Sequence, residues 1–371
     1  MAKKAYLGID GVARKVKKMY LGIDGVAQKI KKGYIGVGGV ARPCFARGLE
    51  YYGRITPLTK SVSDIRSATI GNHVLFGGGR QYKSSGYSNV VDAYDLNLTK
   101  SNPNPLSVVE AEHAATTVGN YALFAGGMDE SINYLNTVNA YDLNLTRTNP
   151  TSLSIPLVRP AGTFVGNYAL FGSGLTNGGN RTDVVNAYNA TLTRTIPTAL
   201  STKMDYSAAT NIGNYALFGG GLVNGVNLNT VNAYNSSLTR TIPTALSIGR
   251  SYIAATPVGN YALFAGGRIL NSGSYVYSSV VDVYDVSLTR TTASNLSVAR
   301  CFYGTATTLK NYALFDGSGS TYVVDAYDTS LTRSNDVSLS INTSGLEAGT
   351  IGNYALFAGG SSNKVDAITI F

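Results

Sequence analysis

Residues 259–267 read Gly-Asn-Tyr-Ala-Leu-Phe-Ala-Gly-Gly, and close copies of this string occur six more times in the 371-residue chain. The asparagine of the copies stands at Asn72, Asn120, Asn167, Asn214, Asn260, Asn311 and Asn353. One copy is degenerate, because Lys310 replaces the glycine before Asn311. The steps between copies are 48, 47, 47, 46, 51 and 42 residues, so the chain contains seven units of similar length.

Each unit has the pattern of four short strands. A run of small residues, such as 253–258, precedes the Gly-Asn turn, and the apolar strand 261–265 follows it. After a variable loop, residues 280–285 alternate in polarity as a half-buried strand does, and a more polar strand follows Leu288-Thr289-Arg290. Abundant Gly, 26 Tyr and only 14% charged residues also favour short strands over helices. Repeats of this length predict an all-β, seven-bladed β-propeller over residues 55–371.

The seventh unit lacks a fourth strand of its own. The Leu-Thr-Lys/Arg element before the fourth strand occurs in six units but not after residues 365–371, which read as a third strand. We expect the early stretch Ile55–Lys60 to supply the missing strand and to pair with 365–371. Closure by an N-terminal strand removes two exposed strand edges and fastens both ends of the propeller.

The glycine pair after the second strand, as at Gly266-Gly267, and the Tyr284-Asp285 pair in the third strand resemble the kelch repeat. The resemblance covers residues 55–371 and implies a kelch-like propeller. Kelch blades usually carry a tryptophan late in the unit, and this chain has none. We expect leucines to fill that packing role, namely Leu98, Leu145, Leu192, Leu238, Leu288 and Leu331.

The loops divide into a uniform set and a variable set. The first-to-second and third-to-fourth turns are nearly identical in all units, whereas the second-to-third loops and the connections between blades differ. Because strands alternate in direction, the two variable sets fall on one face, which is free to bind a ligand or partner. Tyr and Arg are good contact residues. The candidate binding residues on this variable face are Tyr82, Tyr87, Tyr134, Arg159, Arg181, Tyr206, Arg250, Tyr252, Tyr275, Tyr277, Arg300 and Tyr303.

The residues for common chemistries are missing or scattered. No Cys/His cluster has metal-ligand spacing, and no nucleophile elbow or P-loop is present, so we expect no catalytic residues, metal or cofactor. The acidic pairs Asp129-Glu130 and Glu110/Glu112 offer general acid–base chemistry, but loop solvation explains them equally well. We therefore expect a protein that is not an enzyme, with a carbohydrate-active propeller as an alternative.

Positive charge is concentrated at the N-terminal end. Residues 1–60 contain thirteen Lys/Arg and three Asp/Glu, whereas residues 61–371 contain seventeen and eighteen. The propeller thus lacks the basic surface that nucleic-acid binding requires, and no apolar run is long enough to span a membrane. The start of the chain has no apolar segment of a signal peptide, which predicts synthesis in the cytoplasm.

Residues 5–42 contain a second repeat, of fourteen residues, which restarts at Met19 and Gly33. Asp10-Gly11, Asp24-Gly25 and Gly38-Gly39 lie between apolar runs and predict three β-hairpins. A single hairpin cannot bury an apolar face, so we expect residues 1–42 to be a docking or oligomerising anchor, with 43–54 as linker. A basic tail for membrane or nucleic acid is the alternative. The anchor residues are Tyr6, Leu7, Ile9, Tyr20, Leu21, Ile23, Tyr34 and Ile35.

The tandem copies of Tyr-Leu-Gly-Ile-Asp-Gly-Val-Ala resemble repeats in tail-associated structural proteins of phages and prophages of Gram-positive bacteria. The resemblance covers about 40 residues. It implies that residues 1–42 bind other virion proteins, that the chain lies on the particle exterior, and that the propeller binds a host-surface glycan or protein. A purely structural decoration of the capsid or tail, without ligand, is the alternative.

Overall fold

The protein is described by a computed structural model of all 371 residues. The structure describes the backbone of residues 6–9, 12–15, 20–23, 26–29, 33–37, 40–45 and 271. It describes backbone and side chains of residues 48–82, 86–270, 273–301, 305–316 and 321–370. All regular elements of the described residues are strands.

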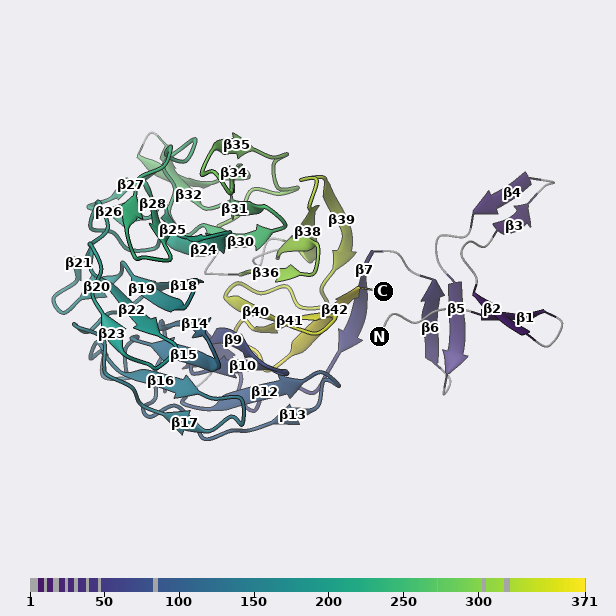
Figure 1. Ribbon diagram of the computed structural model, residues 1–371, viewed down its shortest axis with the longest axis horizontal. Helices are drawn as coiled ribbons and strands as arrows, with labels where there is room; N and C mark the ends of the chain where they lie inside the picture. Colours follow the sequence, from purple (N-terminus) through teal and green to yellow (C-terminus); the bar gives the residue numbers. More distant parts are fainter. Residues whose placement is uncertain are drawn as a thin grey trace.

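Seven four-stranded antiparallel sheets are arranged in a ring, which confirms the predicted seven-bladed β-propeller (Figure 1). Blade 1 consists of β9 (Arg66–Ile70), β10 (His73–Gly77), β12 (Val91–Asp95) and β13 (Lys100–Ser101). Blade 2 consists of β14 (Ala114–Val118), β15 (Tyr121–Ala125), β16 (Val138–Tyr141) and β17 (Arg147–Thr148). Blade 3 consists of β18 (Ala161–Val165), β19 (Tyr168–Gly172), β22 (Val185–Asn189) and β23 (Arg194–Thr195). Blade 4 consists of β24 (Ala208–Ile212), β25 (Tyr215–Gly219), β28 (Val231–Asn235) and β29 (Arg240–Thr241). Blade 5 consists of β30 (Ala254–Val258), β31 (Tyr261–Ala265), β34 (Val281–Asp285) and β35 (Arg290–Thr292).

Blades 6 and 7 complete the ring. Blade 6 consists of β36 (Ala306–Leu309), β37 (Tyr312–Phe315), β38 (Val323–Asp328) and β39 (Arg333–Ser338). Blade 7 consists of β40 (Leu346–Ile351), β41 (Tyr354–Gly359), β42 (Val365–Ile370) and β7 (Leu49–Arg54). The innermost strands contact one another from β9 through to β40, and β40 contacts β9 again (Figure 1). Smaller two-stranded sheets lie in the loops, formed by β8 (Val62–Ser63) with β11 (Arg80–Gln81), β20 (Leu175–Thr176) with β21 (Asn180–Arg181), β26 (Leu222–Val223) with β27 (Val226–Asn227), and β32 (Arg268–Asn271) with β33 (Ser274–Tyr277).

An N-terminal strand closes the ring, but it lies directly before the expected segment, of which Ile55 still donates its amide to the Val365 carbonyl at 3.0 Å. The strand that pairs with β42 is β7, in the register Asp366↔Arg54 to Ile370↔Leu49, so it lies inside the segment expected as linker. Residues 55–60 instead connect blade 7 to blade 1, and the Thr59 amide donates to Asp92 of blade 1 at 2.9 Å. Ser107, Ser154, Ser201 and Ser247 make the same bond to the next blade in the other connections.

The second and third strands of each blade are buried on both faces because the blades stack against one another. The Ala-Leu-Phe residues of the second strand, replaced by Val74-Leu75-Phe76 in blade 1, are almost completely inaccessible. In six blades the phenylalanine packs edge-on against the third-strand tyrosine, as Phe264 does against Tyr284 at 5.8 Å between ring centroids. That tyrosine hydroxyl donates to a carbonyl of the preceding connection, as Tyr284 does to Thr244 at 2.7 Å. These buried tyrosines link each blade to its neighbour.

The uniform turns of adjacent blades pack closely against one another on one face of the propeller. A Cβ atom on Gly119 would lie 3.0 Å from Cβ of Ala190, which belongs to the third-to-fourth turn of the next blade. Five other turn glycines face the next blade in the same way, at 2.7 to 3.4 Å. Blade 7 has no third-to-fourth turn, because its outer strand is β7. The preceding blade therefore tolerates Lys310 at the glycine position, although its φ is 55°.

The second-to-third loops and the connections between blades lie together, as the alternation of strands predicts. Isolated bridges join them at Ala111↔Met128, Val158↔Leu175, Asp205↔Leu222 and Ser251↔Arg268. The predicted leucines pack beside the core clusters, where Leu98 is 8% exposed and the others are partly buried. All six adopt a φ of 61–63° in the third-to-fourth turn.

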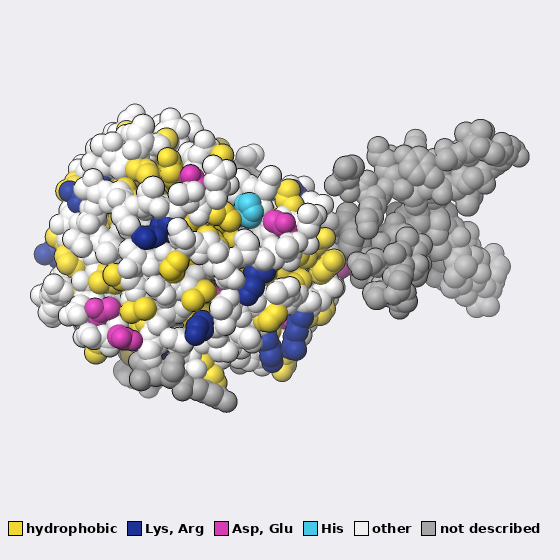
Figure 2. All heavy atoms as spheres, turned by 90° about the horizontal axis from the view of Figure 1, so that it is seen from below, with side chains coloured by type: hydrophobic (Ala, Val, Ile, Leu, Met, Phe, Trp, Pro, Cys, Tyr) yellow, Lys and Arg dark blue, Asp and Glu magenta, His cyan; other side chains and the backbone are white. Residues whose placement is uncertain are grey.

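The three predicted N-terminal hairpins are present. β1 (Tyr6–Ile9) pairs with β2 (Val12–Lys15), β3 (Tyr20–Ile23) with β4 (Val26–Lys29), and β5 (Gly33–Val37) with β6 (Val40–Phe45). Figure 1 shows them outside the ring, on the side of β7. The predicted anchor residues all lie on β1, β3 and β5, and their side chains lie outside the described residues. On the side of the ring that Figure 2 shows, acidic and basic side chains are scattered, as the near balance of charge in residues 61–371 predicts.

Candidate ligand-binding site on the variable face

One position of the repeat, eight residues before the asparagine of the first turn, opens each blade on the variable face. It is occupied by Asp64, Glu112, Arg159, Tyr206, Tyr252 and Gly345, and by Tyr303, which lies outside the described residues. The five described non-glycine residues have φ between 52° and 57°. Such a backbone is unfavourable for these residues and is therefore imposed by the fold. The leucines of the opposite face share this kind of backbone but are all identical, so only the variable face has been free to diversify.

The two acidic residues at this position, Asp64 and Glu112, form ion pairs with Arg80 and Arg159. Arg80 lies between blades, with Nε 3.9 Å from Asp64 Oδ2 and Nη2 3.2 Å from Glu112 Oε1. On the other side of Glu112, Arg159 Nε is 2.6 Å from its Oε2. Nearby charges of this kind keep Arg159 protonated, and the pKa of Arg159 is raised by Glu112 against the opposing effect of burial.

The two tyrosines at this position, Tyr206 and Tyr252, extend this series of contacts. The Arg159 guanidinium lies 4.7 Å from the ring centre of Tyr206, which stacks on Tyr252 at 3.8 Å with 25° between planes. Arg268 then lies between Tyr252 and Tyr275, at 4.4 and 3.9 Å from the two ring centres. Burial raises the pKa of Tyr206. We define the arc as Asp64, Arg80, Glu112, Arg159, Tyr206, Tyr252, Arg268 and Tyr275.

An ion pair supports the arc at its centre. Arg181 Nε lies 2.9 Å from Asp205 Oδ1 and donates to the Leu222 carbonyl at 3.0 Å. Asp205 is 1% exposed and precedes Tyr206 in the chain. Burial raises the pKa of Asp205, while Arg181 opposes this rise. The pair thus fixes the backbone that presents Tyr206.

Two of the predicted contact residues were wrong. Arg250 and Arg300 are fully buried and bind Asp282 and Asp325 in the third strand of the next blade. Arg250 also donates to the carbonyls of Gly266 and Val280 at 2.7 Å. These arginines hold blades together and do not reach the surface.

The other predicted residues divide by location. Arg159, Tyr206, Tyr252 and Tyr275 belong to the arc, and Arg181 supports it. Tyr87 packs against Arg80 at 5.4 Å, and Tyr277 lies on β33 beside the arc. Tyr82 and Tyr134 lie in second-to-third loops outside the arc, and Tyr303 lies outside the described residues.

Arg80 and Arg268 were not predicted. Each directly follows the glycine pair of its blade, where blades 2, 3 and 4 carry Met128, Leu175 and Leu222. The signal was therefore available: two units place a cation where the others place an apolar residue, at the start of a variable loop.

The acidic pair Glu110/Glu112 is split between interior and surface. Glu112 belongs to the arc, whereas Glu110 is fully buried beside His113, whose Nδ1 lies 3.9 Å from Glu110 Oε1. Burial raises the pKa of Glu110 to about 8 and lowers that of His113 to about 3, so both are neutral at pH 7. Buried in this way, Glu110 has no access to a substrate. Leu157 and Met204 occupy the same position in the next two connections.

Glu110→Gln is expected to stabilise the protein at pH 8–9 and to leave it unchanged at pH 4.5. The unfolded state releases the Glu110 proton near pH 4.5, whereas the folded state keeps it up to about pH 8. The contribution of Glu110 to stability is therefore fully present below pH 4.5 and falls as pH rises, by about 1.4 kcal/mol per pH unit within this window. Thermal unfolding at the two pH values measures the difference. The exposed Glu130→Gln is the control, and an equal gain at both pH values would contradict the assignment.

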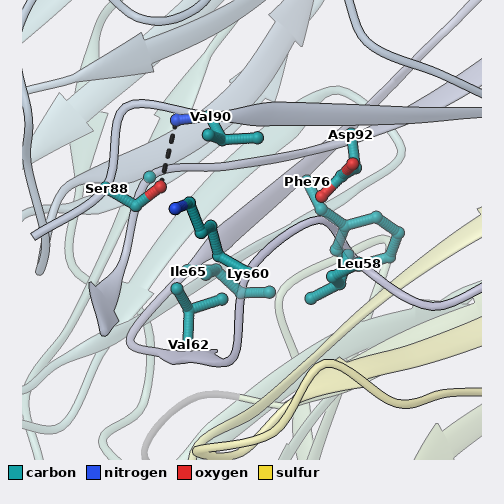
Figure 3. A pocket seen from close by; sticks show the side chains of 9 residues that line it. Leu58, Lys60, Val62, Ile65, Phe76, Ser88, Val90 and Asp92 are labelled. Carbon is teal, nitrogen blue, oxygen red and sulfur yellow. Dashed lines mark hydrogen bonds between the residues drawn. The ribbon is translucent and has the colours of Figure 1, made fainter. Parts of the chain in front are cut away.

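The hollows of the described residues do not coincide with the arc. A cavity of about 10 Å³ lies beside the connection from blade 7 to blade 1, where Ser88 accepts a hydrogen bond from the Val90 amide (Figure 3). It has room for one water molecule at most. An open hollow of about 250 Å³ is lined by Gly213 and Gly259 of the uniform turns and so lies on the opposite face.

The described residues contain no group of three or more His, Cys, Asp or Glu that could hold a metal ion. They also contain no helix long and apolar enough to cross a membrane.

The propeller is similar to a solved structure titled "Structure of YjhT". The TM-score is 0.57, and the match covers 84% of this chain and 99% of that chain. The sequences are 10% identical, so the likeness concerns the fold alone. No family model matches the sequence, and a comparison with curated proteins found no match.

Proposed function

We propose that the chain is a non-enzymatic structural accessory protein of a phage-type particle, whose propeller binds a host-surface glycan or protein through the arc. One observation carries the binding role. Five described, equivalent positions with the same imposed backbone carry two acids, a base and two tyrosines on the variable face. The repeated positive-φ turn residue of the opposite face is always leucine. A surface that only had to be solvated would not need four consecutive ion-pair and aromatic contacts between blades.

The attachment role is proposed from residues 1–42. Three copies of a basic hairpin repeat precede the propeller, and a two-stranded sheet is marginally stable alone, so the copies need a partner surface or one another. In this proposal the hairpins bind other virion proteins and join copies of the chain, which places it on the particle exterior. The kelch-like identity of the blades belongs to the same proposal and is supported by the glycine pairs and the third-strand Tyr-Asp residues.

The double variant Tyr206→Ala/Tyr252→Ala is expected to weaken binding to host cells or to host glycans on an array by at least tenfold, because central stacked aromatics dominate interface energetics. Tyr82→Ala is the matched control, since this tyrosine lies on the same face outside the arc and is 55% exposed. Thermal unfolding verifies that the variants are folded. Wild-type protein that binds no host surface, yet is incorporated into particles, would support the purely structural decoration.

A further inference from the structure

The arginines at the arc differ in whether an acid neutralises them. Arg80 contacts Asp64 and Glu112, Arg159 contacts Glu112, and Arg181 contacts Asp205. Arg268 has no carboxylate within ion-pair distance among the described residues. Its Nε is buried and has no hydrogen-bond partner there. A buried N–H group without an acceptor is unfavourable, and an external anion would supply the missing acceptor.

The position of Arg268 is rigidly set by its backbone. It is the first residue of β32, its amide donates to the Ser251 carbonyl at 2.7 Å, and its carbonyl accepts from the Ser251 amide at 3.1 Å. Its guanidinium lies between the rings of Tyr252 and Tyr275. Both rings lie within cation–π distance of the guanidinium carbon, and the guanidinium N–H groups are suited to donate to a planar oxyanion.

Exposed apolar surface adjoins this cation. In the register of the β32–β33 hairpin, Arg268 pairs with Tyr277 and Leu270 with Tyr275, so all four side chains share one face. Leu270, Tyr275 and Tyr277 are 46%, 45% and 53% exposed. Flat aromatic surfaces next to an unpaired cation suit a ligand that carries an oxyanion on a rigid ring.

We propose that Arg268 is the anion-binding residue of the arc and that the ligand is an acidic polysaccharide, whose carboxylate, sulfate or phosphate binds the guanidinium edge while a sugar ring packs on Tyr275 and Tyr277. An acidic sugar offers the anion and the ring as one rigid unit, whereas a peptide carboxylate sits on a flexible side chain and costs more to order. This inference rests on the proposed function and adds the ligand class to it.

The test measures binding of the full chain to polygalacturonate, dextran sulfate, a phosphate-bearing polysaccharide, neutral dextran and poly-L-glutamate. We expect binding to at least one anionic polysaccharide and not to dextran, with the preferred probe identifying the oxyanion. Arg268→Gln is expected to weaken that binding by ten- to a hundredfold, and Arg268→Lys by less, since it keeps the charge but loses the planar fork. Arg54→Gln, which removes the same charge from a paired arginine on β7 outside the arc, is expected to change binding by less than threefold.

Equal losses for Arg268→Gln and Arg54→Gln would overturn the proposal, because they indicate unspecific electrostatic attraction. Equal binding of poly-L-glutamate with the same dependence on Arg268 would overturn it in favour of an acidic protein ligand. Host-cell binding that is lost in Tyr206→Ala/Tyr252→Ala but unaffected by Arg268→Gln would sink this inference and leave the proposed function standing. Absence of any host-surface binding by the wild type would instead sink the proposed function.

Discussion

A chain that begins at Ile55 is expected to be at least 3–8 kcal/mol less stable than one that begins at Gly48, and to aggregate. The shorter chain loses β7, which pairs with β42 over the five positions from Asp366 to Ile370. At about 0.5–1.5 kcal/mol for each lost hydrogen bond, this pairing alone accounts for the range. The Tyr51 hydroxyl, which donates to Asp366 at 3.0 Å, is lost as well. Thermal unfolding and size-exclusion chromatography of the two chains measure the effect.

The loss of β7 has a second consequence at the edge of blade 7. Ala367 and Ile368 of β42 are fully buried and would become part of an unpaired outer strand, which is a template for aggregation. The chain that begins at Gly48 is the control, because it lacks the hairpins but keeps β7, and it should unfold at the temperature of the full chain. Equal stability of the chains beginning at Gly48 and Ile55 would show that residues 55–60 can close the ring after all. Under the proposed function, neither shortened chain is incorporated into particles.

The repeats predicted the number of blades but not the segment that supplies the closing strand. The blade number followed from seven copies of one string, because each blade must repeat the same packing with its neighbour. The segment 55–60 was misread because its Leu58-Thr59-Lys60 matches the Leu-Thr-Lys/Arg element that precedes the fourth strand in the other units. Its Leu58-Thr59 is equivalent to Leu200-Ser201 and Leu246-Ser247 in other connections, so aligning the connections would have moved the strand six residues earlier.

The candidate site was predictable only in part, because exposure is a tertiary property. Arg159 and Arg250 both lie in connections between blades, but Arg250 aligns with the apolar Leu157 and Met204, whereas Arg159 stands two positions later in the repeat. A second signal lies in the third strand of the next blade. It carries Asp282 or Asp325 after Arg250 or Arg300, and Asn139, Asn186 or Asn232 after Glu110, Leu157 or Met204. The contact of Arg268 with two tyrosines depends on how β32 is placed and could not be read from spacing.

Replacement of Asp282 by asparagine is expected to lower the free energy of unfolding by about 3–5 kcal/mol, because it removes one partner of a buried ion pair. The Arg250 side chain is completely inaccessible and Asp282 supplies its counter-charge. Burial lowers the pKa of Arg250 while Asp282 raises it, so removal of the carboxylate leaves the charged guanidinium unfavourable. The more exposed Arg290, 3.1 Å from Asp282, can turn to solvent. Urea unfolding measures the loss.

Blade 4 provides the control, because Met204 and Asn232 occupy the same two positions there. Adding Arg250→Met to Asp282→Asn should restore most of the lost stability, since replacing a buried pair by packed uncharged residues is often neutral or favourable. Arg250→Met alone should cost less than Asp282→Asn, because Asp282 keeps Arg290 and the Ser247 amide at 3.0 Å. The double-mutant cycle therefore predicts strong coupling. Additive losses of stability would show that the two side chains act independently. If Arg250→Met left stability unchanged but abolished ligand binding, Arg250 would be a surface contact residue, as the sequence predicted.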